Sequence, residues 1–338
     1  MVANTALDTV KWGVEKMNPD FIKRISAWTA LKGGGNYNQT KNVVDIKTIE
    51  ALSQFIGYVK YAYYSIDSKR NQSDKGDIRV YFRGQTKHYL TTQKNVNLFP
   101  SIFRRVNSLK MAKDNFDKLE EFIKENEHLF MDKGRYPYAY TAILQQYGLS
   151  TEWLDIVDNI WSALWFASHG LEKIGNSSSE DNIQLLKYVE SEKDYSYIYV
   201  MAFEKLMPQK QFFLKKENLE NAKDGEIAEV IDLRMAIPSM YLRPHCQHAL
   251  MVRKKINWSS PSMSIDLLNL QDHLVATLRI KTKDVLKWLG TSELLSNKYF
   301  FPSLDFDEGY KILYHEMKKR ELPLEPCLGK LAQYSFSC

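Results

Sequence analysis

The residues best suited to chemistry form the triplet Arg83-Gly84-Gln85, which ends an apolar run that starts at Asp77. A guanidinium offers a planar fork of N–H donors that matches the oxygens of a phosphate or a carboxylate. Gly84 has no side chain, so a ligand could approach the backbone closely at this point. The triplet therefore indicates an anion-binding site, with a structural ion pair to a carboxylate such as Asp155 as the alternative.

The run before the triplet must place Arg83 at the end of a rigid element. Ile78, Val80 and Phe82 alternate with other residues, which predicts a strand over 77–85 with one face toward a core. Helices are expected over residues 48–65, 108–131, 139–147, 160–168 and 307–319, and strands over residues 195–203, 246–254 and 274–280. Because helices predominate early and strands late, the pattern favours the α+β class.

Chain length and loop composition bear on the domain organisation. At 338 residues the chain can form one large or two modest domains. The glycine-rich stretch 33–38 is expected to be a flexible break, and the polar stretch 173–194 a mobile insertion. The sequence predicts a helical accessory region over 1–70, a main domain over 71–320 and a C-terminal tail over 321–338.

Composition argues against several classes of protein. The 46 basic and 41 acidic residues give a net charge of +5, which permits a basic groove without requiring nucleic acid. Three cysteines without metal-like spacing fit a reducing cytoplasm, and no metal site is expected. We recognise no signal peptide and no apolar run of the roughly 20 residues that span a bilayer. A cytoplasmic protein without a membrane partner is therefore expected.

Further polar and aromatic motifs follow the triplet along the chain. They occupy residues 98–104, 144–155, 159–167 and 301–305, and the pair Arg243 and Gln247. Together with the triplet they resemble the FRG domain, a family named for its Phe-Arg-Gly sequence, over roughly residues 76–317. Gln146 and Glu152 stand where this family usually has histidine and arginine.

The resemblance implies a fold and a site. FRG domains look similar in layout to ADP-ribosyltransferases, which implies a mixed or antiparallel sheet core with flanking helices. ADP-ribosyltransferases bind NAD with an arginine or histidine on an early strand, a small polar segment before a helix, and a late strand that carries glutamate or a substitute. By this resemblance the candidate catalytic residues are Arg83 and Gln247, and the candidate NAD-binding residues are Arg83, Gln85, Thr151 and Asp155.

Each later candidate has an alternative role. Thr151 and Asp155 are expected where a turn enters a helix. Thr151 could orient a ribose hydroxyl or satisfy backbone donors, and Asp155 could fix a neighbouring loop. Gln247 could hydrogen-bond a ribose, but an amide carries no negative charge and cannot act as a general base. His245 and His248 could supply that base, although a lone histidine is more often structural.

Two classes of function follow. The leading hypothesis is a nucleotide or NAD pocket in a toxin or defence effector, which transfers ADP-ribose to a protein or nucleic acid acceptor or cleaves NAD. The alternative is a non-enzymatic binding module whose polar residues form a structural network. Nucleic-acid processing is a third hypothesis, and it rests only on the net positive charge.

Overall fold

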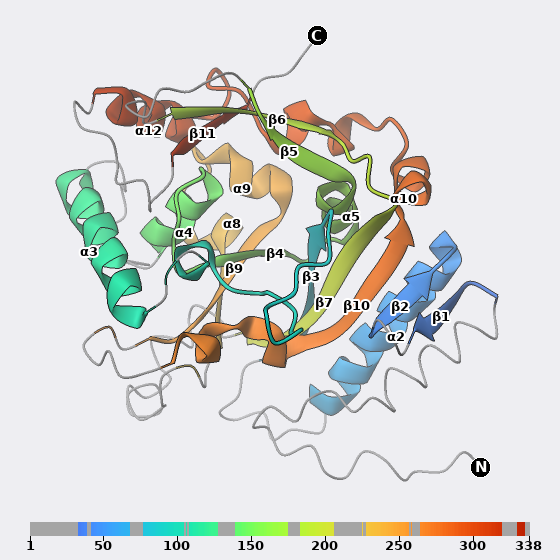
Figure 1. Cartoon of the computed structure of the whole chain (residues 1–338). Coiled ribbons are helices and arrows are strands. Elements are labelled where there is room, and N and C mark those ends of the chain that lie inside the picture. The colour runs from blue at the N-terminus through green and yellow to red at the C-terminus, as the bar shows by residue number, and fades with distance from the viewer. Residues whose placement is uncertain are drawn as a thin grey trace.

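A mixed sheet of eight strands crosses the molecule (Figure 1). The computed structural model describes residues 33–38, 42–67, 77–104, 106, 108–127, 139–174, 183–205, 225, 228–256, 258, 264–319 and 330–334. The strands of the sheet are β1 (Gly35–Asn38), β2 (Val43–Ile46), β3 (Asp77–Gln85), β4 (Leu154–Val157), β7 (Tyr195–Lys205), β8 (Ala228–Asp232), β9 (Ala249–Lys254) and β10 (Leu274–Lys281). They lie in the order β1-β2-β10-β7-β3-β4-β9-β8, where β2 and β10 run parallel and the other neighbours antiparallel.

A smaller sheet and the helices surround this main sheet. The smaller sheet contains β5 (His169–Lys173), β6 (Ile183–Glu190) and β11 (Leu331–Tyr334), with β6 in the middle. The helices include α2 (Ile49–Asp67), α3 (Leu109–Glu125), α4 (Ala139–Gln146), α5 (Ile160–Ser168), α8 (Leu233–Ala236), α9 (Leu242–Gln247), α10 (Thr282–Leu289), α11 (Asn297–Phe300) and α12 (Glu308–Lys319). Figure 1 shows the small sheet beside α12 at the top, with α3 and α2 at opposite sides. The prediction of an α+β protein with a mixed sheet and flanking helices is confirmed.

Strand β3 separates two cores and so gives its side chains two environments. Ile78, Val80 and Phe82 are buried in a core to which α2 and α5 contribute. Tyr81 points to the opposite face, where it packs in a second core with residues of β7. The alternation that predicted this strand is therefore confirmed, and it places Arg83 on the same face of β3 as Tyr81.

Gly84 lies where α5 crosses β3. A Cβ atom at this position would lie 1.9 Å from the carbonyl oxygen of Ala163 and 2.7 Å from the backbone nitrogen of Ala167, both in α5. The missing side chain therefore lets the helix backbone pack against the strand. The space that a Cβ atom of Gly84 would fill is thus taken by α5 and not by a ligand, whereas the backbone of Gly84 lines the pocket described below, so close approach of a ligand at this point stays a prediction.

Two stretches expected to be irregular contain strands. Residues 35–38 form β1, which pairs with β2. Residues 183–190 form β6, which lies between β5 and β11 and makes a ladder with each. The strand partners of β6 supply the order that its polar composition did not predict, because strand formation depends strongly on tertiary context.

The strand expected over 246–254 begins at Ala249, because α9 precedes it. Asp307 accepts a hydrogen bond from the backbone N–H of Arg243 at 3.0 Å, which satisfies a donor in the first turn of α9. The residue after α9 adopts a left-handed conformation with φ of 54°, and the strand starts there. Gln247 therefore ends a helix, whereas it was expected on a late strand.

The chain on either side of the predicted boundaries at residues 70 and 320 shares these sheets. β2 pairs with β10, and Phe55 and Val59 of α2 pack in the same core as Phe82. β11 pairs with β6. β1 and β2 show that the predicted accessory region is not purely helical, while residues 1–32 and 321–329 lie outside the described part of the chain. The boundaries themselves stay predictions.

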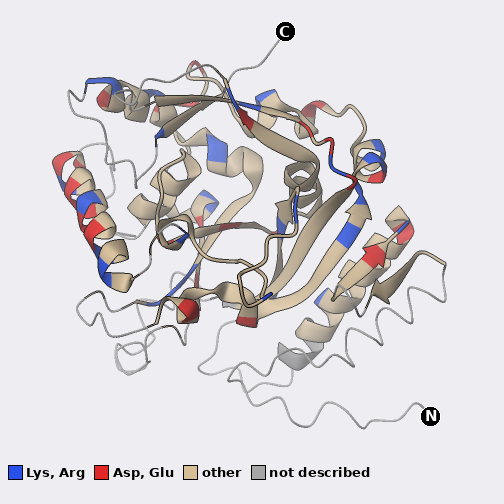
Figure 2. Ribbon diagram, viewed as in Figure 1, with Lys and Arg blue, Asp and Glu red and all other residues tan. Residues whose placement is uncertain are grey.

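The helices expected from apolar spacing are present. Helices α2, α4, α5 and α12 lie close to their expected bounds, whereas α3 ends at Glu125, before the expected residue 131. Figure 2 shows basic and acidic residues interspersed along α3, whose buried stripe contains Phe116, Leu119 and Phe122. Among the described helices, none combines the length and the apolar character that crossing a bilayer requires.

The contact between β3 and α5 can be tested by substitution. We expect Gly84→Ala to lower the free energy of unfolding by at least about 2 kcal/mol, because the new methyl group meets helix backbone that cannot move aside alone. Chemical denaturation of both proteins measures this difference. Gly57→Ala in α2 is the matched control, since a Cβ there meets nothing within 4 Å, and it should be neutral or stabilise by about 0.5–1 kcal/mol. Equal stability of Gly84→Ala and the parent would contradict the packing argument.

Candidate functional site

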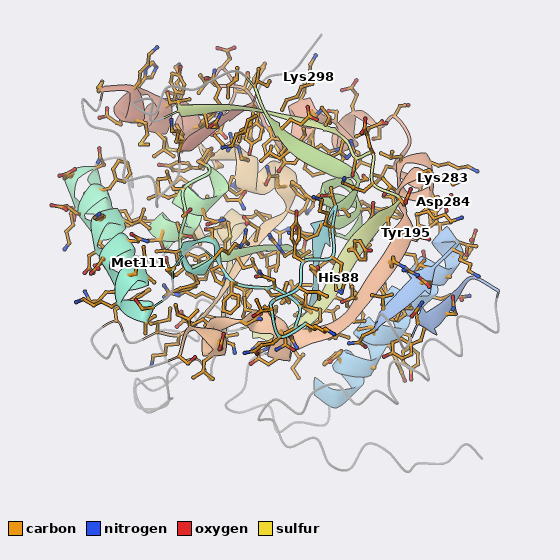
Figure 3. All side chains as sticks on the ribbon, in the orientation of Figure 1. His88, Met111, Tyr195, Lys283, Asp284 and Lys298 are labelled. Atoms are coloured by element: carbon orange, nitrogen blue, oxygen red, sulfur yellow. The ribbon has the colours of Figure 1, made fainter. Side chains whose placement is uncertain are left out.

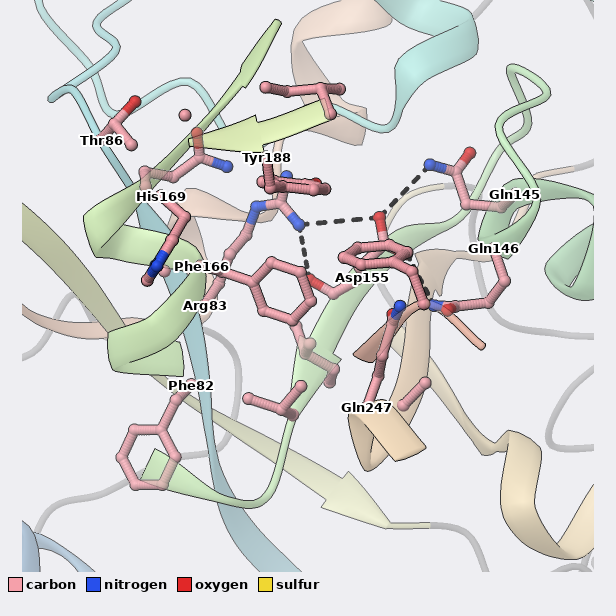
Figure 4. Close-up of a pocket in the computed structure, with 18 of the residues that line it drawn as sticks. Phe82, Arg83, Thr86, Gln145, Gln146, Asp155, Phe166, His169, Tyr188 and Gln247 are labelled. Atoms are coloured by element: carbon pink, nitrogen blue, oxygen red, sulfur yellow. Dashed lines mark hydrogen bonds and ion pairs between the residues drawn. The ribbon is translucent and has the colours of Figure 1, made fainter. Parts of the chain in front are cut away.

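A pocket of about 510 Å³ lies beside the end of β3 (Figure 4). Its polar lining residues are Arg83, Gln85, Thr86, Lys87, Gln145, Gln146, Asp155, His169 and Gln247, and its aromatic ones are Phe82, Tyr89, Phe166, Tyr188, Phe301 and Tyr334. They come from both sheets, from helices α4, α5 and α9, and from loops. Pockets of about 300–1,000 Å³ with mixed apolar and polar walls are typical of small-molecule sites.

Arg83 is held on two sides at the wall of this pocket. Its Nη1 donates to the backbone carbonyl of Asp155 at 2.7 Å and lies 3.7 Å from the Oδ2 of that residue. The side-chain oxygen of Gln85, with the amide turned toward the guanidinium, accepts from Nε at 3.1 Å and from Nη2 at 2.8 Å. These three hydrogen bonds leave two of the five guanidinium N–H donors for a ligand.

Burial and charge act in opposite directions on Arg83. Its side chain is only 13% exposed. Burial lowers the pKa of Arg83, while the negative charge of Asp155 opposes that change and favours the charged guanidinium. The expected alternative, an ion pair between Arg83 and Asp155, is therefore present in the structure. Because both partners line the pocket, this pairing does not remove Arg83 from a ligand.

Asp155 presents a carboxylate whose orientation is fixed by two amides of α4. Gln146 donates through Nε2 to Oδ1 at 2.9 Å, and Gln145 donates through Nε2 to Oδ2 at 3.3 Å (Figure 4). The side chain of Asp155 remains 37% exposed. Asp155 lies in β4, where it pairs with Met251, so the expectation that it sits where a turn enters a helix is corrected by the strand ladder.

Thr151 lies behind the pocket and outside its lining. The residue is fully buried, and its hydroxyl donates to the side-chain oxygen of Gln145 at 3.1 Å. The same hydroxyl accepts from the backbone N–H of Trp153 at 3.2 Å. Thr151 thus satisfies a backbone donor and orients Gln145, which in turn holds Asp155. It was expected to contact NAD directly, and its position supports the structural alternative.

Gln247 reaches the pocket from the end of α9 (Figure 4). Its Nε2 donates to the carbonyl oxygen of Phe300 at 2.7 Å, so the amide is anchored to the backbone. His245 and His248 do not line the described pocket, and His248 Nδ1 lies 3.1 Å from Nη1 of Arg234. The acidic residue among those that line this pocket is Asp155. The sequence had instead placed Gln247 at the late catalytic position, where ADP-ribosyltransferases usually have glutamate.

His169 lines the pocket and was not among the candidates from the sequence (Figure 4). Its Nδ1 lies 2.9 Å from the carbonyl oxygen of Trp165, which requires a donor at that nitrogen. The neutral ring therefore carries its lone pair on Nε2. Its ring also stacks on Trp165, with centroids 4.3 Å apart. The sequence feature that could have identified His169 is its position directly after the helix expected over 160–168, close to the end of a family motif.

The loop after β3 is held against the sheet by His88. Its ring stacks on Tyr197 with centroids 5.2 Å apart, and its Nδ1 lies 3.2 Å from the hydroxyl of Tyr199 (Figure 3 shows where His88 lies). Thr86 and Lys87, which precede His88, line the pocket. The contacts of His88 to β7 therefore hold the loop that brings a second cationic residue, Lys87, to the pocket.

Glu152, which replaces a usual arginine of the family, is buried away from the pocket. It is 1% exposed and accepts from Nη1 of Arg253 at 2.8 Å and from the hydroxyl of Thr141 at 2.7 Å. The guanidinium of Arg253 also lies 4.5 Å from the ring of Trp153. The charge of Glu152 is thus paired within the core, where it supports β4 and β9.

Residues 78–174 match the family model of the FRG domain. This segment of the chain is an FRG domain. The matched segment of the FRG domain contains Arg83, Asp155 and His169, while Gln247 and the aromatic residues of β6 and β11 lie beyond it. No curated protein and no solved structure matches the chain. Within the described residues, no group of three or more His, Cys, Asp or Glu residues could hold a metal ion.

The protonation of His169 can be measured directly. Burial lowers the pKa of His169 below its ordinary value of 6.5, against the opposing hydrogen bond to Trp165. We expect the imidazole signal to titrate below pH 6.5 in an NMR experiment, with His169→Gln to assign it. Because the unfolded chain takes up a proton near pH 6.5 and the folded His169 only at lower pH, the stability present above pH 6.5 is lost as the pH falls into that window. A pKa of 6.5 or higher would contradict this environment.

Proposed function

We propose that this FRG-domain protein binds NAD, or another phosphate-bearing nucleotide, in the pocket at the end of β3. The observation that carries the proposal is the meeting of a largely buried arginine and a half-buried carboxylate, Arg83 and Asp155, in one pocket of about 510 Å³. A dinucleotide needs a cation for its pyrophosphate, acceptors for its ribose hydroxyls and apolar surface for its rings. The lining of the pocket contains all three kinds of group.

Each group of the ligand has a matching partner in the pocket. The two remaining N–H donors of Arg83 and the ammonium of Lys87 suit phosphate oxygens. Gln146 Oε1 is buried without a hydrogen-bond partner among the described residues, and Gln146 lines the pocket. Such an acceptor calls for a donor, and a ribose hydroxyl supplies one. Figure 4 shows Phe166 and Tyr188 beside the Arg83–Asp155 pair, where a planar ring of the ligand can stack.

The proposed reaction is cleavage of NAD or transfer of its ADP-ribose. The bond between ribose C1′ and the nicotinamide nitrogen breaks, and nicotinamide leaves with the bonding electrons. The oxygen of water or of a macromolecular acceptor, protein or nucleic acid, then bonds to C1′ and gives its proton to a base. The negative charge of Asp155 stabilises the cationic sugar, and the neutral Nε2 of His169 accepts the proton.

This assignment moves the acidic role from Gln247 to Asp155. Gln247 then contributes an amide oxygen for a ribose hydroxyl, since its Nε2 is already bound to the Phe300 carbonyl. In this proposal β3 is the early strand that carries the arginine in the ADP-ribosyltransferase layout. An enzyme that consumes NAD or modifies a cellular target in the cytoplasm would act as a toxin or defence effector.

A non-catalytic binding module is the second candidate, and one observation favours it. Both oxygens of Asp155 already accept hydrogen bonds from Gln145 and Gln146, and Arg83 already binds Gln85. A network that satisfies itself in this way can exist for stability alone. In that case the pocket would bind a ligand without reacting with it, and nicotinamide would not be released.

Calorimetric titration of NAD tests binding. We expect the wild-type protein to bind and Arg83→Ala to bind about 10- to 150-fold more weakly, because hydrogen bonds to a charged group contribute about 1.5–3 kcal/mol. Arg79→Ala is the matched control, since Arg79 lies in the same strand, is exposed and does not line the pocket. Absence of binding by the wild type, or equal losses in the two variants, would refute the nucleotide site.

Release of nicotinamide, measured by chromatography, tests the reaction. We expect Asp155→Asn to release nicotinamide about a hundredfold more slowly, because it keeps the shape but removes the charge that stabilises the cationic sugar. Asp114→Asn, at an exposed position of α3, should react like the wild type. If the wild-type protein binds NAD and releases no nicotinamide with or without added cell extract, the binding module is the correct function.

A further inference from the structure

A second pocket, of about 240 Å³, adjoins the first and contains a buried arginine, Arg243. Phe301 and Tyr334 line both pockets, so the two share a wall. Arg243 lies in the first turn of α9, and its side chain is fully buried. A charged group in this position requires partners, because burial of an unpaired charge costs several kcal/mol in real proteins.

Aromatic rings surround the guanidinium of Arg243. Its Cζ atom lies 4.3 Å from the ring centre of Tyr147, 4.6 Å from Tyr310, 5.0 Å from Tyr334 and 5.6 Å from Phe301. Burial raises the pKa of Tyr310 to about 12, against the opposing charge of Arg243. The phenol is therefore neutral at pH 7 and offers a ring face. The cage stabilises a cation without neutralising it.

The hydrogen bonds of Arg243 leave one edge of the guanidinium open. Nη1 donates to the backbone carbonyl of Gln146 at 3.0 Å. Nε and Nη2 are buried, and neither makes a hydrogen bond of good geometry among the described residues, although the guanidinium lies close enough to the Tyr310 hydroxyl to act against the raised pKa of that phenol. The described part of the chain also contains no carboxylate within ion-pair distance of this side chain. Nε and Nη2 together form the edge that binds two oxygens of one oxyanion side by side.

Two other arginines of the chain show what this edge does when an oxyanion is present. Arg279 donates through Nε and Nη2 to the two oxygens of Asp45 at 2.6 and 2.8 Å. Arg234 donates through the same two atoms to the oxygens of Asp232 at 2.9 and 2.8 Å. In both cases a carboxylate occupies the edge for which Arg243 has no carboxylate partner among the described residues.

We propose that the second pocket is an oxyanion subsite, in which Nε and Nη2 of Arg243 bind two oxygens of a carboxylate or a phosphate group. Ser303 and Gln333 also line this pocket and can add hydrogen bonds to the oxyanion. Asp305 lines it as well and is exposed, so its negative charge opposes the anion and favours one of low charge. The subsite does not depend on which ligand the first pocket binds.

The subsite is coupled to the first pocket through Gln146. The backbone carbonyl of Gln146 accepts from Arg243, and its side-chain amide donates to Asp155 at 2.9 Å. An anion that draws the guanidinium toward the second pocket therefore acts on the residue that orients the Asp155 carboxylate. A ligand long enough to pass Phe301 and Tyr334 would occupy both pockets.

NMR of the arginine Nε–H groups tests the subsite in the full chain. Acetate and inorganic phosphate are titrated separately at constant ionic strength, with sodium chloride as the balancing salt. We expect the Nε–H signal of Arg243, assigned by its absence in Arg243→Lys, to shift saturably with at least one of them. A response to acetate alone identifies a carboxylate ligand, and a response to phosphate identifies a phosphate ligand. A signal that neither anion shifts overturns the proposal.

Thermal unfolding adds a second readout. The anion that shifts the Nε–H signal should raise the Tm of the wild type and of Arg79→Lys, and this increase should be absent in Arg243→Lys, which keeps the charge but loses the fork. If Arg243→Lys does not fold, Asp305→Asn replaces it. This variant removes a repulsive charge at an exposed position, so it should bind the anion severalfold more tightly. Unchanged or weaker binding by Asp305→Asn would overturn the subsite.

Discussion

The hydrogen-bonded carboxylate of Asp155 is the interaction on which the rest of the site depends. It joins three elements, because Arg83 comes from β3, Asp155 from β4, and the two amides that hold it from α4. A carboxylate in a half-buried position is stable only if its oxygens find donors. The end of α4 must therefore lie against β4, and this requirement sets the shape of the pocket.

The turn after α4, which must hold α4 against β4, is itself fixed by the small sheet. Gly148 has a φ of 108°, a conformation that other residues adopt only with strain, and a Cβ there would meet Ala332 of β11 at 2.8 Å. The backbone N–H of Ala332 donates to the carbonyl oxygen of Tyr147 at 2.7 Å. β11 is thereby fixed against the same turn that positions Gln146. The small sheet is thus part of the site, and it contributes Tyr188 and Tyr334 to the pocket wall.

Four of the described arginines form two groups according to what occupies the edge made by Nε and Nη2. In Arg234 and Arg279 a carboxylate fills it, and these residues act as structural ion pairs. In Arg83 a neutral amide fills it, and in Arg243 no described group does. Both arginines of the second group line pockets. An incompletely neutralised guanidinium beside a cavity is a better sign of ligand binding than the presence of an arginine alone.

The sequence predicted those features that depend on local periodicity. The alternation of Ile78, Val80 and Phe82 was sufficient to predict β3, and the family motifs were sufficient to find the FRG domain. It did not predict features that depend on distant partners. Gln247 ends α9, a short helix that begins at Leu242, and the backbone N–H of Arg243 in its first turn donates to Asp307, a residue 64 positions away. No spacing rule connects these two residues.

Gln146 shows why the site could be anticipated only in part. The sequence identified it as a departure from the usual histidine, a change that threatened any chemistry that needs that ring. In the structure its amide donates to Asp155, a hydrogen bond that a histidine N–H could also make. An amide does not titrate, so the donor of this hydrogen bond does not change with pH. The glutamine therefore preserves the orientation of the carboxylate, and in the proposed reaction the proton would be accepted by His169, which lines the same pocket.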